Sequence, residues 1–199
     1  GLWPKPIVEL EFAGRTAFVE SHCPGYDCRF CYRSQKYLEG IYQLGLDFLL
    51  KFHRATMSYQ SSQGAHWARW LEERERFLEP IIPARYRDRW RELVDGVREY
   101  LHQEQVPSVW MHGDFWPGNL LADETGDRLV GVVDWEFSEA RGLPLSDLIQ
   151  LLLYIKTFSA KRGFGSLLAD RLSAGGFRRE EQLCIQTYCR ALDMPERHI

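Results

Sequence analysis

The feature of the sequence that most constrains the fold is a polar loop between short apolar segments. Residues 112–119 have the sequence His-Gly-Asp-Phe-Trp-Pro-Gly-Asn, which places Asp114 and Asn119 five residues apart. The glycines permit a positive φ or a close approach of the backbone to a ligand, and the proline stiffens the chain between the two polar residues. Apolar segments at 109–111 and 120–122 flank this loop.

A β-hairpin is predicted to follow the loop. Residues 123–127 (Asp-Glu-Thr-Gly-Asp) have the composition of a tight turn, and the apolar run 129–133 is typical of a buried strand. Asp134 comes directly after that run, so Asp114 and Asp134 are expected to face one cleft. The alternative is a solvated turn and a chance His-Gly-Asp sequence, which requires several residue types to coincide.

This set of residues fits the chemistry of phosphoryl transfer. Mg²⁺ takes oxygen ligands, commonly one or two carboxylates together with phosphate oxygens and waters. Asn119 and Asp134 can supply such oxygens. Asp114 is then left to orient an attacking hydroxyl and to accept its proton. The sequence therefore predicts a loop that serves Mg²⁺, a nucleoside triphosphate and a hydroxyl acceptor.

The pattern resembles the signature of the aminoglycoside phosphotransferase and choline kinase-type family, which shares the protein-kinase fold. The resemblance implies that Asp114 is the catalytic base. It also implies that Asn119 and Asp134 bind the metal, with Glu136 as an acidic neighbour that assists it. His112, the first residue of the motif, would support the catalytic loop.

Asp147 belongs to a segment, 142–148, that resembles the following segment of the same family. In the family an aspartate at this point opens a helix and braces the catalytic loop from behind. On the residues alone, Asp147 can equally be a capping or first-turn acid of an apolar helix. The two interpretations are compatible, and the sequence leaves both open.

The amino-terminal residues are predicted to form two strands, 7–12 and 16–20, around a short turn. By the resemblance, residues 1–24 are a remnant of the small lobe with the hinge, and residues 25–199 are the helical large lobe. The backbone of the hinge would bind the adenine, through Glu20, Ser21 and His22.

A kinase-like site also needs a glycine-rich loop over the phosphates and a strand lysine. The sequence contains no G-x-G-x-x-G, and Lys5 lies between two prolines, which disfavour a central strand. We therefore expect most of the small lobe to be absent from the chain. Part of the acceptor site is expected to be absent as well, because the chain stops soon after residue 192.

Three cysteines after the predicted hinge raise a competing interpretation. Cys23, Cys28 and Cys31 have a spacing that can bind zinc or an iron–sulfur cluster, with Cys184 and Cys189 as candidate further ligands. Free cysteine is also a small hydrophobic residue that is often buried. We favour burial over metal binding.

Periodic apolar residues predict five helices in the rest of the chain, over about 35–53, 67–78, 85–103, 145–158 and 178–192. Ser34 can cap the first helix, and His53 at its end is interpreted as a core or helix-terminal histidine. The segment 161–176 is predicted to be a loop, at least at its ends, because it contains several glycines.

The acceptor is the least defined part of the prediction. In the family, large-lobe helices form the acceptor pocket, and cationic acceptors favour an acidic or aromatic lining. Trp67, Trp70 and Trp116 are candidates for that lining, although a tryptophan at helical spacing is more often part of a core. The sequence does not define the substrate.

The composition limits the other functional classes. The 199 residues, of which 45% are hydrophobic, suffice for one domain with a sizeable core. A net charge of −3 gives no electrostatic case for a nucleic-acid partner. No signal peptide or membrane-spanning run is present, and the cysteines show no secreted framework, so a cytoplasmic protein is expected.

Together these patterns predict an α+β, protein-kinase-like fold that consists mainly of the helical C-terminal lobe. The predicted function is ATP- and Mg²⁺-dependent phosphorylation of a hydroxyl on a small molecule of the aminoglycoside, sugar or amino-alcohol type. The competing hypothesis is a non-catalytic, kinase-derived binding or scaffold domain, or an inactive fragment, because the phosphate-clamping loop and lysine are not in the sequence.

Overall fold

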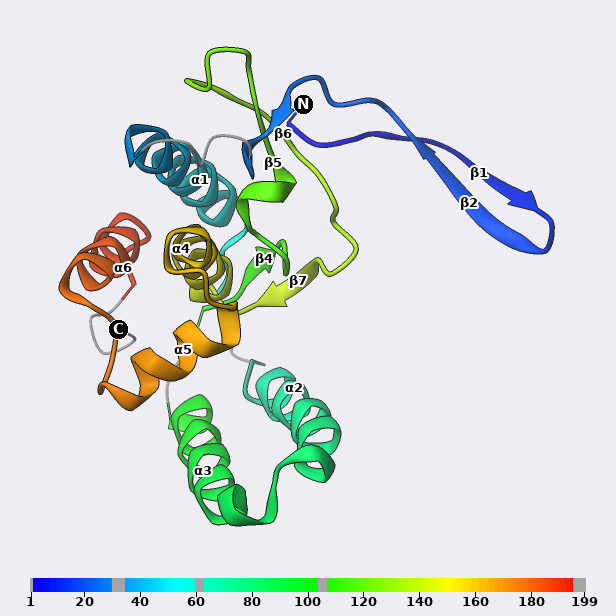
Figure 1. Cartoon of the computed structure of the whole chain (residues 1–199). Coiled ribbons are helices and arrows are strands. Elements are labelled where there is room, and N and C mark those ends of the chain that lie inside the picture. The colour runs from blue at the N-terminus through cyan, green and yellow to red at the C-terminus, as the bar shows by residue number, and fades with distance from the viewer. Residues whose placement is uncertain (1, 30–34, 60–62, 104–106, 195–199) are drawn as a thin grey trace. The chain divides into compact units, whose positions relative to one another are not determined.

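The computed structural model describes residues 2–29, 35–59, 63–103 and 107–194 (Figure 1). These residues form the predicted α+β fold, in which helices predominate. The helices are α1 (Gln35–Thr56), α2 (Gln63–Leu78), α3 (Arg87–Gln103), α4 (Leu145–Ala160), α5 (Phe164–Ser173) and α6 (Arg179–Ala191). Short 3₁₀ helices are η2 (Glu79–Ile81), η3 (Ala84–Tyr86) and η4 (Pro117–Asn119).

The strands of the described residues form small antiparallel sheets. One sheet pairs β1 (Pro6–Phe12) with β2 (Arg15–Glu20), and another pairs β4 (Val109–Met111) with β7 (Glu139–Gly142). In the third sheet β5 (Leu120–Ala122) lies between β3 (Tyr26–Asp27) and β6 (Leu129–Val132). The predicted hairpin after the catalytic-loop motif is therefore confirmed as β5 and β6.

The chain folds into two compact units. One comprises Gly1–Thr56 and Val109–Ile199, and the other comprises Met57–Ser108. The predicted catalytic, metal-binding and hinge residues all belong to the first unit, whereas Trp67 and Trp70, proposed for the acceptor pocket, belong to the second. The predicted boundary between small-lobe remnant and large lobe, at residue 24, does not coincide with the boundaries of these units, and it stays a prediction.

The two predicted amino-terminal strands are confirmed as β1 and β2. Their connecting residues, Ala13 and Gly14, have φ values of 50° and 72°. Two consecutive residues with positive φ are the geometry of the tight hairpin turns whose twist matches that of paired strands. The turn thereby sets the register in which Leu10 lies opposite Ala17.

Helices α1 and α4 pack closely in the first unit and form its core. A Cβ on Gly45 of α1 would lie 2.7 Å from Cδ2 of Leu151 in α4, so only glycine permits this approach. Leu49 of α1 and Leu148 of α4 are completely buried in the same core. The Phe48 ring stacks on that of Phe115, with centroids 5.7 Å apart, which joins α1 to the polar loop.

In the second unit α2 packs against α3. The apolar residues from which the helix over 85–103 was predicted do not all lie on one buried face: Val94 and Leu101 are buried, whereas Leu93 is 58% exposed. Leu93 and Val94 are adjacent, so they point about 100° apart around the helix and do not share one face.

The helix predictions differ from the structure mainly at their ends. α1 continues past His53 to Thr56, and the proposed cap, Ser34, lies outside the described residues. The segment 161–176 is irregular at its ends, as predicted, but α5 occupies its centre. The buried side chain of Leu167 explains this helix, because tertiary packing outweighs the flanking glycines. Within the described residues, no helix has the length and apolar character that crossing a bilayer requires.

Candidate active site

Asp114 and Asn119 are hydrogen-bonded to each other. Asn119 Nδ2 donates to the backbone oxygen of Asp114 at 2.9 Å and to its Oδ2 at 3.1 Å. Because both partners are acceptors, the NH₂ end of the Asn119 amide must face Asp114. Its Oδ1 then points elsewhere, and this oxygen is the atom that could bind a cation. η4 provides the turn that brings the two residues together.

The imidazole of His112 connects the loop to the end of β6. The backbone N–H of Asp114 donates to His112 Nδ1 at 3.3 Å, and His112 Nε2 donates to the backbone oxygen of Val133 at 2.9 Å. Burial lowers the pKa of His112, while its bond to Val133 and the nearby carboxylates act in the opposite direction. A neutral ring with its proton on Nε2 satisfies both bonds. His112 thus joins Asp114 to the residue that precedes Asp134.

Asp147 holds the backbone at the start of the loop. It accepts hydrogen bonds from His112 N at 2.7 Å and from Gly113 N at 2.9 Å. It lies in the first turn of α4, whose N-cap, Pro144, makes no side-chain cap. Asp147 is therefore a first-turn acid of α4, which is one interpretation that the sequence left open. Its hydrogen bonds to the loop are those that the other interpretation, a brace behind the loop, requires.

A buried network lies behind Asp147. His53 Nε2 is 3.4 Å from Asp147 Oδ2, and both side chains are fully buried. The Tyr188 hydroxyl donates to the backbone oxygen of Pro144 at 2.7 Å, so it accepts from His53 Nδ1. Burial raises the pKa of Tyr188 and keeps this hydroxyl protonated. His53 is a core residue, as the sequence indicated.

The glycines of the loop are required by its geometry. Gly113 has a φ of 87°, and a Cβ there would lie 2.1 Å from the backbone oxygen of Phe137. A Cβ on Gly118 would lie 2.4 Å from Cζ2 of Trp116. The loop conformation that brings Asp114 to Asn119 therefore depends on residues without side chains at both positions.

Asp134 follows β6 in a left-handed conformation, with a φ of 66°. The backbone N–H of Val133 donates to the backbone oxygen of Asn119 at 3.0 Å. The residue before Asp134 is therefore hydrogen-bonded to Asn119, with which Asp134 is predicted to share a metal. A non-glycine residue with positive φ is uncommon and is often found at functional sites.

A cavity of about 660 Å³ opens beside Asp134. Of the predicted site residues, Glu20, Asp134 and Glu136 line it, together with aromatic side chains that include Trp110 and Trp135. Asp114 and Asn119 do not line this cavity. The structure therefore places the predicted residues in two linked groups, one at the cavity and one in the loop.

The donor atoms fit a magnesium ion better than a transition metal. Asn119, Asp134 and Glu136 supply only oxygen, which is the ligand type that Mg²⁺ prefers. Among the described residues, no three His, Cys, Asp or Glu side chains form a ready metal site. Mg²⁺ does not need one, since it usually combines one or two carboxylates with phosphate oxygens and waters.

The predicted hinge follows β2. Ser21 N donates to the backbone oxygen of Lys5 at 2.9 Å, and Lys5 N donates to Ser21 Oγ at 2.8 Å. Because the Ser21 N–H is engaged in this way, adenine contacts through the hinge would use the backbone of Glu20 or His22. Lys5 precedes β1, which agrees with its predicted exclusion from a central strand.

Cys31, one of the three cysteines proposed to bind zinc or an iron–sulfur cluster, lies outside the described residues. Cys28 and Cys189 are buried, as expected of small hydrophobic residues, whereas Cys23 and Cys184 are half-buried. Burial raises the pKa of Cys189 to about 11, which disfavours a thiolate there.

The tryptophans proposed for an acceptor pocket have different environments. Trp67 is completely buried in the second unit and contacts Trp70, as a core residue does. Trp116 of the catalytic loop lies 5.6 Å from the Tyr154 ring, and the Arg29 guanidinium lies 5.5 Å from its ring centroid. Trp116 is thus the candidate that lies beside Asp114.

One residue of the site was missed by the sequence analysis. Gln150 of α4 accepts a hydrogen bond from Phe115 N and donates one to the backbone oxygen of Gly113. It follows Asp147 by three residues, which places both side chains on one helix face. That spacing is the only sequence signal that could have pointed to it.

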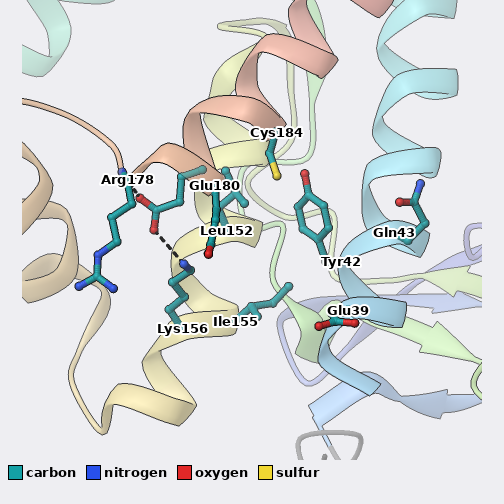
Figure 2. Close-up of a pocket in the computed structure, with 10 residues that line it drawn as sticks. Glu39, Tyr42, Gln43, Leu152, Ile155, Lys156, Arg178, Glu180 and Cys184 are labelled. Carbon is teal, nitrogen blue, oxygen red and sulfur yellow. Dashed lines mark hydrogen bonds and ion pairs between the residues drawn. The ribbon is translucent and has the colours of Figure 1, made fainter. Parts of the chain in front are cut away.

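A second cavity, of about 590 Å³, is lined by residues of α1, α4 and α6 (Figure 2). It contains none of the predicted catalytic, magnesium-binding or hinge residues, but Cys184, a candidate ligand of the cysteine hypothesis, lines it. Lys156 Nζ lies 3.2 Å from Glu181 Oε1 at its wall. Burial raises the pKa of Tyr42, whose hydroxyl faces the Cys184 thiol.

Small-molecule phosphotransferases are among the solved structures that resemble this chain. The chain is similar to aminoglycoside phosphotransferase APH(3'')-Id from Streptomyces rimosus, in complex with ADP and streptomycin, with a TM-score of 0.54 and 18% identity over 97% of this chain and 69% of that one. It is also similar to a glucosamine kinase, with a TM-score of 0.50 and 16% identity over 97% of this chain and 55% of that one. At these identities the likeness shows the kinase-like fold.

No match is found among curated proteins. The sequence model of the phosphotransferase enzyme family (APH) matches residues 11–183, which include the catalytic-loop motif and Asp147. The family that the motif predicted is therefore confirmed: the chain belongs to the APH phosphotransferase enzyme family.

Proposed function

We propose that the protein transfers the γ-phosphoryl group of ATP to a hydroxyl of a small molecule in a Mg²⁺-dependent reaction. The observation that carries this proposal is the hydrogen-bonded pair of Asp114 and Asn119, linked through His112 and Val133 to the start of Asp134. Family membership supports the coarser statement that the protein is a small-molecule phosphotransferase.

In this mechanism Asp114 orients the acceptor hydroxyl and takes its proton. The acceptor oxygen forms a bond to the γ-phosphorus, and the bond from that phosphorus to the bridging oxygen breaks. ADP leaves with the electron pair of the broken bond. Because the transition state is loose, positioning of the reactants contributes more than the basicity of the carboxylate.

Asn119 Oδ1, Asp134 and Glu136 would hold the metal. When bound, Mg²⁺ neutralises the charge that develops on the phosphate oxygens. The hydrogen bonds from Asn119 Nδ2 to Asp114 keep the asparagine oxygen turned away from the base.

The nucleotide would bind along the hinge and the cavity beside Asp134. Glu20 belongs to both, since it ends β2 and lines that cavity. His22 would complete the proposed hinge contacts to the adenine, whereas the Ser21 N–H is bonded to the backbone oxygen of Lys5. A cytoplasmic location, as the cysteine pattern predicts, would supply the ATP.

The acceptor would be an aminoglycoside, a sugar or an amino alcohol. One structural neighbour is recorded with streptomycin, and another is a glucosamine kinase, so both compounds are suitable first probes. Trp116, two residues after Asp114, and the Tyr154 ring 5.6 Å from it would offer aromatic surface on which a sugar ring could rest.

The competing function is a non-catalytic nucleotide-binding or scaffold domain. It is favoured by one observation: Asp114 and Asn119 do not line the cavity that Asp134 and Glu136 line. A domain of this kind would bind nucleotide without transferring the phosphoryl group.

Titration calorimetry with ATP, in the presence of Mg²⁺ or of EDTA, tests the proposal. We expect binding that requires Mg²⁺ and that is lost in Asp134→Ala. The control variant is Asp127→Ala, which removes an exposed aspartate from the turn of the same hairpin. Binding that is equal with and without Mg²⁺, or equal in the two variants, contradicts the metal assignment.

ADP release with streptomycin and glucosamine then separates the two functions. Mg²⁺-dependent binding together with acceptor-stimulated ADP release supports the enzyme. Binding without release on these acceptors and a wider panel of sugars and amino alcohols supports the scaffold.

A further inference from the structure

We propose that Gln150 is a positioning residue for Asp114, and this inference rests on the catalytic role of Asp114 in the proposed function. The amide of Gln150 makes two hydrogen bonds to the loop. Phe115 N donates to Oε1 at 2.7 Å, and Nε2 donates to the backbone oxygen of Gly113 at 2.8 Å. Both polar ends of the glutamine side chain are therefore used on the residues immediately before and after Asp114.

These bonds complete the hydrogen bonding of two peptide groups. Gly113 O belongs to the peptide group before the Asp114 Cα, and Phe115 N belongs to the one after it. The N–H of the first group donates to His112 Nδ1 at 3.3 Å, and the oxygen of the second accepts from Asn119 Nδ2 at 2.9 Å. All four polar atoms of the peptide groups that flank the Asp114 Cα are thus bonded.

This arrangement fixes both backbone torsions of Asp114. The N–H and C=O of a trans peptide group point in opposite directions, so each plane is held from two sides. The orientations of the two planes define φ and ψ, and these define the direction of the Cα–Cβ bond. One anchor of each plane is the Gln150 amide, and Asp114 O in the second plane also accepts a hydrogen bond from Trp116 N at 3.2 Å. The Gln150 amide therefore helps to set the direction of the Asp114 side chain.

The role of Gln150 can be separated from packing. α4 is held in the core by leucines on another part of its surface, among them Leu148, Leu151 and Leu152, all of which are buried. Methionine is close to glutamine in length and volume but has no amide. Gln150→Met therefore removes both hydrogen bonds and leaves the leucine contacts in place.

A displacement of about 1 Å at a reacting group can lower a rate about 10²-fold. For Gln150→Met we expect kcat for ADP release, measured with Mg·ATP and streptomycin or glucosamine, to fall at least tenfold. KM for ATP should stay within twofold, because the proposed metal ligands and hinge are untouched. The matched control is Gln182→Met, which removes an exposed glutamine from α6 and should leave kcat unchanged.

Amide hydrogen exchange by NMR gives a readout that does not need turnover. The Phe115 amide should exchange at least tenfold faster in Gln150→Met than in Gln182→Met, since it loses its acceptor. The Gly113 amide, which is bonded to Asp147, should remain protected. Gln150→Glu keeps an oxygen that accepts from Phe115 N but loses the donor to Gly113 O. The Phe115 amide should therefore stay protected from exchange in this variant, while kcat still falls.

The proposal that Gln150 positions Asp114 is overturned if Gln150→Met keeps kcat within twofold of the control. It is also overturned if the exchange rate of the Phe115 amide hydrogen does not change. It is also overturned if kcat falls only in proportion to the unfolded fraction. If Gln150→Met does not fold, Gln150→Glu with normal kcat overturns it equally. Failure of the proposed function gives a different result: the wild type would then release no ADP with either acceptor, or Asp114→Asn would turn over like the wild type, whatever Gln150 does.

Discussion

His53 Nε2 lies 3.4 Å from Asp147 Oδ2, and neither side chain has any solvent exposure. The same carboxylate accepts two backbone hydrogen bonds from the start of the loop 112–119, at His112 and Gly113. The core between α1, α4 and α6 is thereby connected directly to the loop that carries Asp114. Core stability and loop geometry should consequently change together when this carboxylate is altered.

Asp147→Asn should destabilise the protein by about 2–4 kcal/mol, because an amide NH₂ would replace an acceptor oxygen that buried N–H groups require. Equilibrium urea unfolding measures the loss. Asp127→Asn, at an exposed turn position, should change the free energy of unfolding by less than about 0.5 kcal/mol. Equal free energies of unfolding in the two variants would show that the hydrogen bonds of Asp147 do not stabilise the protein.

Gly113→Ala should destabilise the protein by about 2–5 kcal/mol, because the residue has a positive φ and its new Cβ would overlap the Phe137 carbonyl. The control is Gly40→Ala in α1, where nothing lies within 4 Å of a new Cβ. This helical change should be neutral or stabilise by up to about 1 kcal/mol. Thermal unfolding of both variants makes the comparison, and an alanine tolerated at 113 would contradict the loop geometry.

Glu181 should make the protein sensitive to acid. Burial alone would raise the pKa of Glu181, but hydrogen bonds from Arg171 and from Arg178 N, with the Lys156 ammonium nearby, lower it to about 2 from 4.5. Its pKa is depressed in the folded state, so the unfolded chain binds more protons in this range. The stability that it contributes is complete above pH 4.5 and is lost as the pH falls toward 2.

Glu181→Gln should therefore be less stable at neutral pH, by about 3–5 kcal/mol, because Arg171 would remain buried without its carboxylate. Its stability should also depend less on pH between 4.5 and 2. Glu180→Gln, at the exposed neighbouring position, should keep the wild-type pH dependence. Unfolding curves at a series of pH values test this, and parallel curves for the two variants would argue against the buried ion pair.

The parts of the site that the sequence predicted are those encoded by neighbouring residues. The turn at 123–127 and the apolar runs on both sides of it specify β5 and β6, so the position of Asp134 after the return strand followed directly. Gly113 and Gly118 were recognised as loop residues because their freedom is local.

Contacts between distant segments were not predictable in the same way. Gln150 bonds to a loop 35 residues earlier in the chain, and a glutamine in an apolar helix carries no periodic signal of that contact. The buried pair of Arg171 and Glu181 joins α5 to α6, and α5 itself was hidden by the glycines at its ends. Tertiary packing, which propensity does not contain, decided each of these cases.

The single-turnover rate of phosphoryl transfer by Asp114→Asn, compared with the wild type, tests the central claim most directly. Asparagine keeps the size of the side chain and removes its ability to accept a proton. The rate should fall by about 10²–10⁴-fold, while Mg·ATP affinity and the free energy of unfolding stay close to those of the wild type. A rate within twofold of the wild type would contradict the assignment of Asp114 as the base and the mechanism built on it.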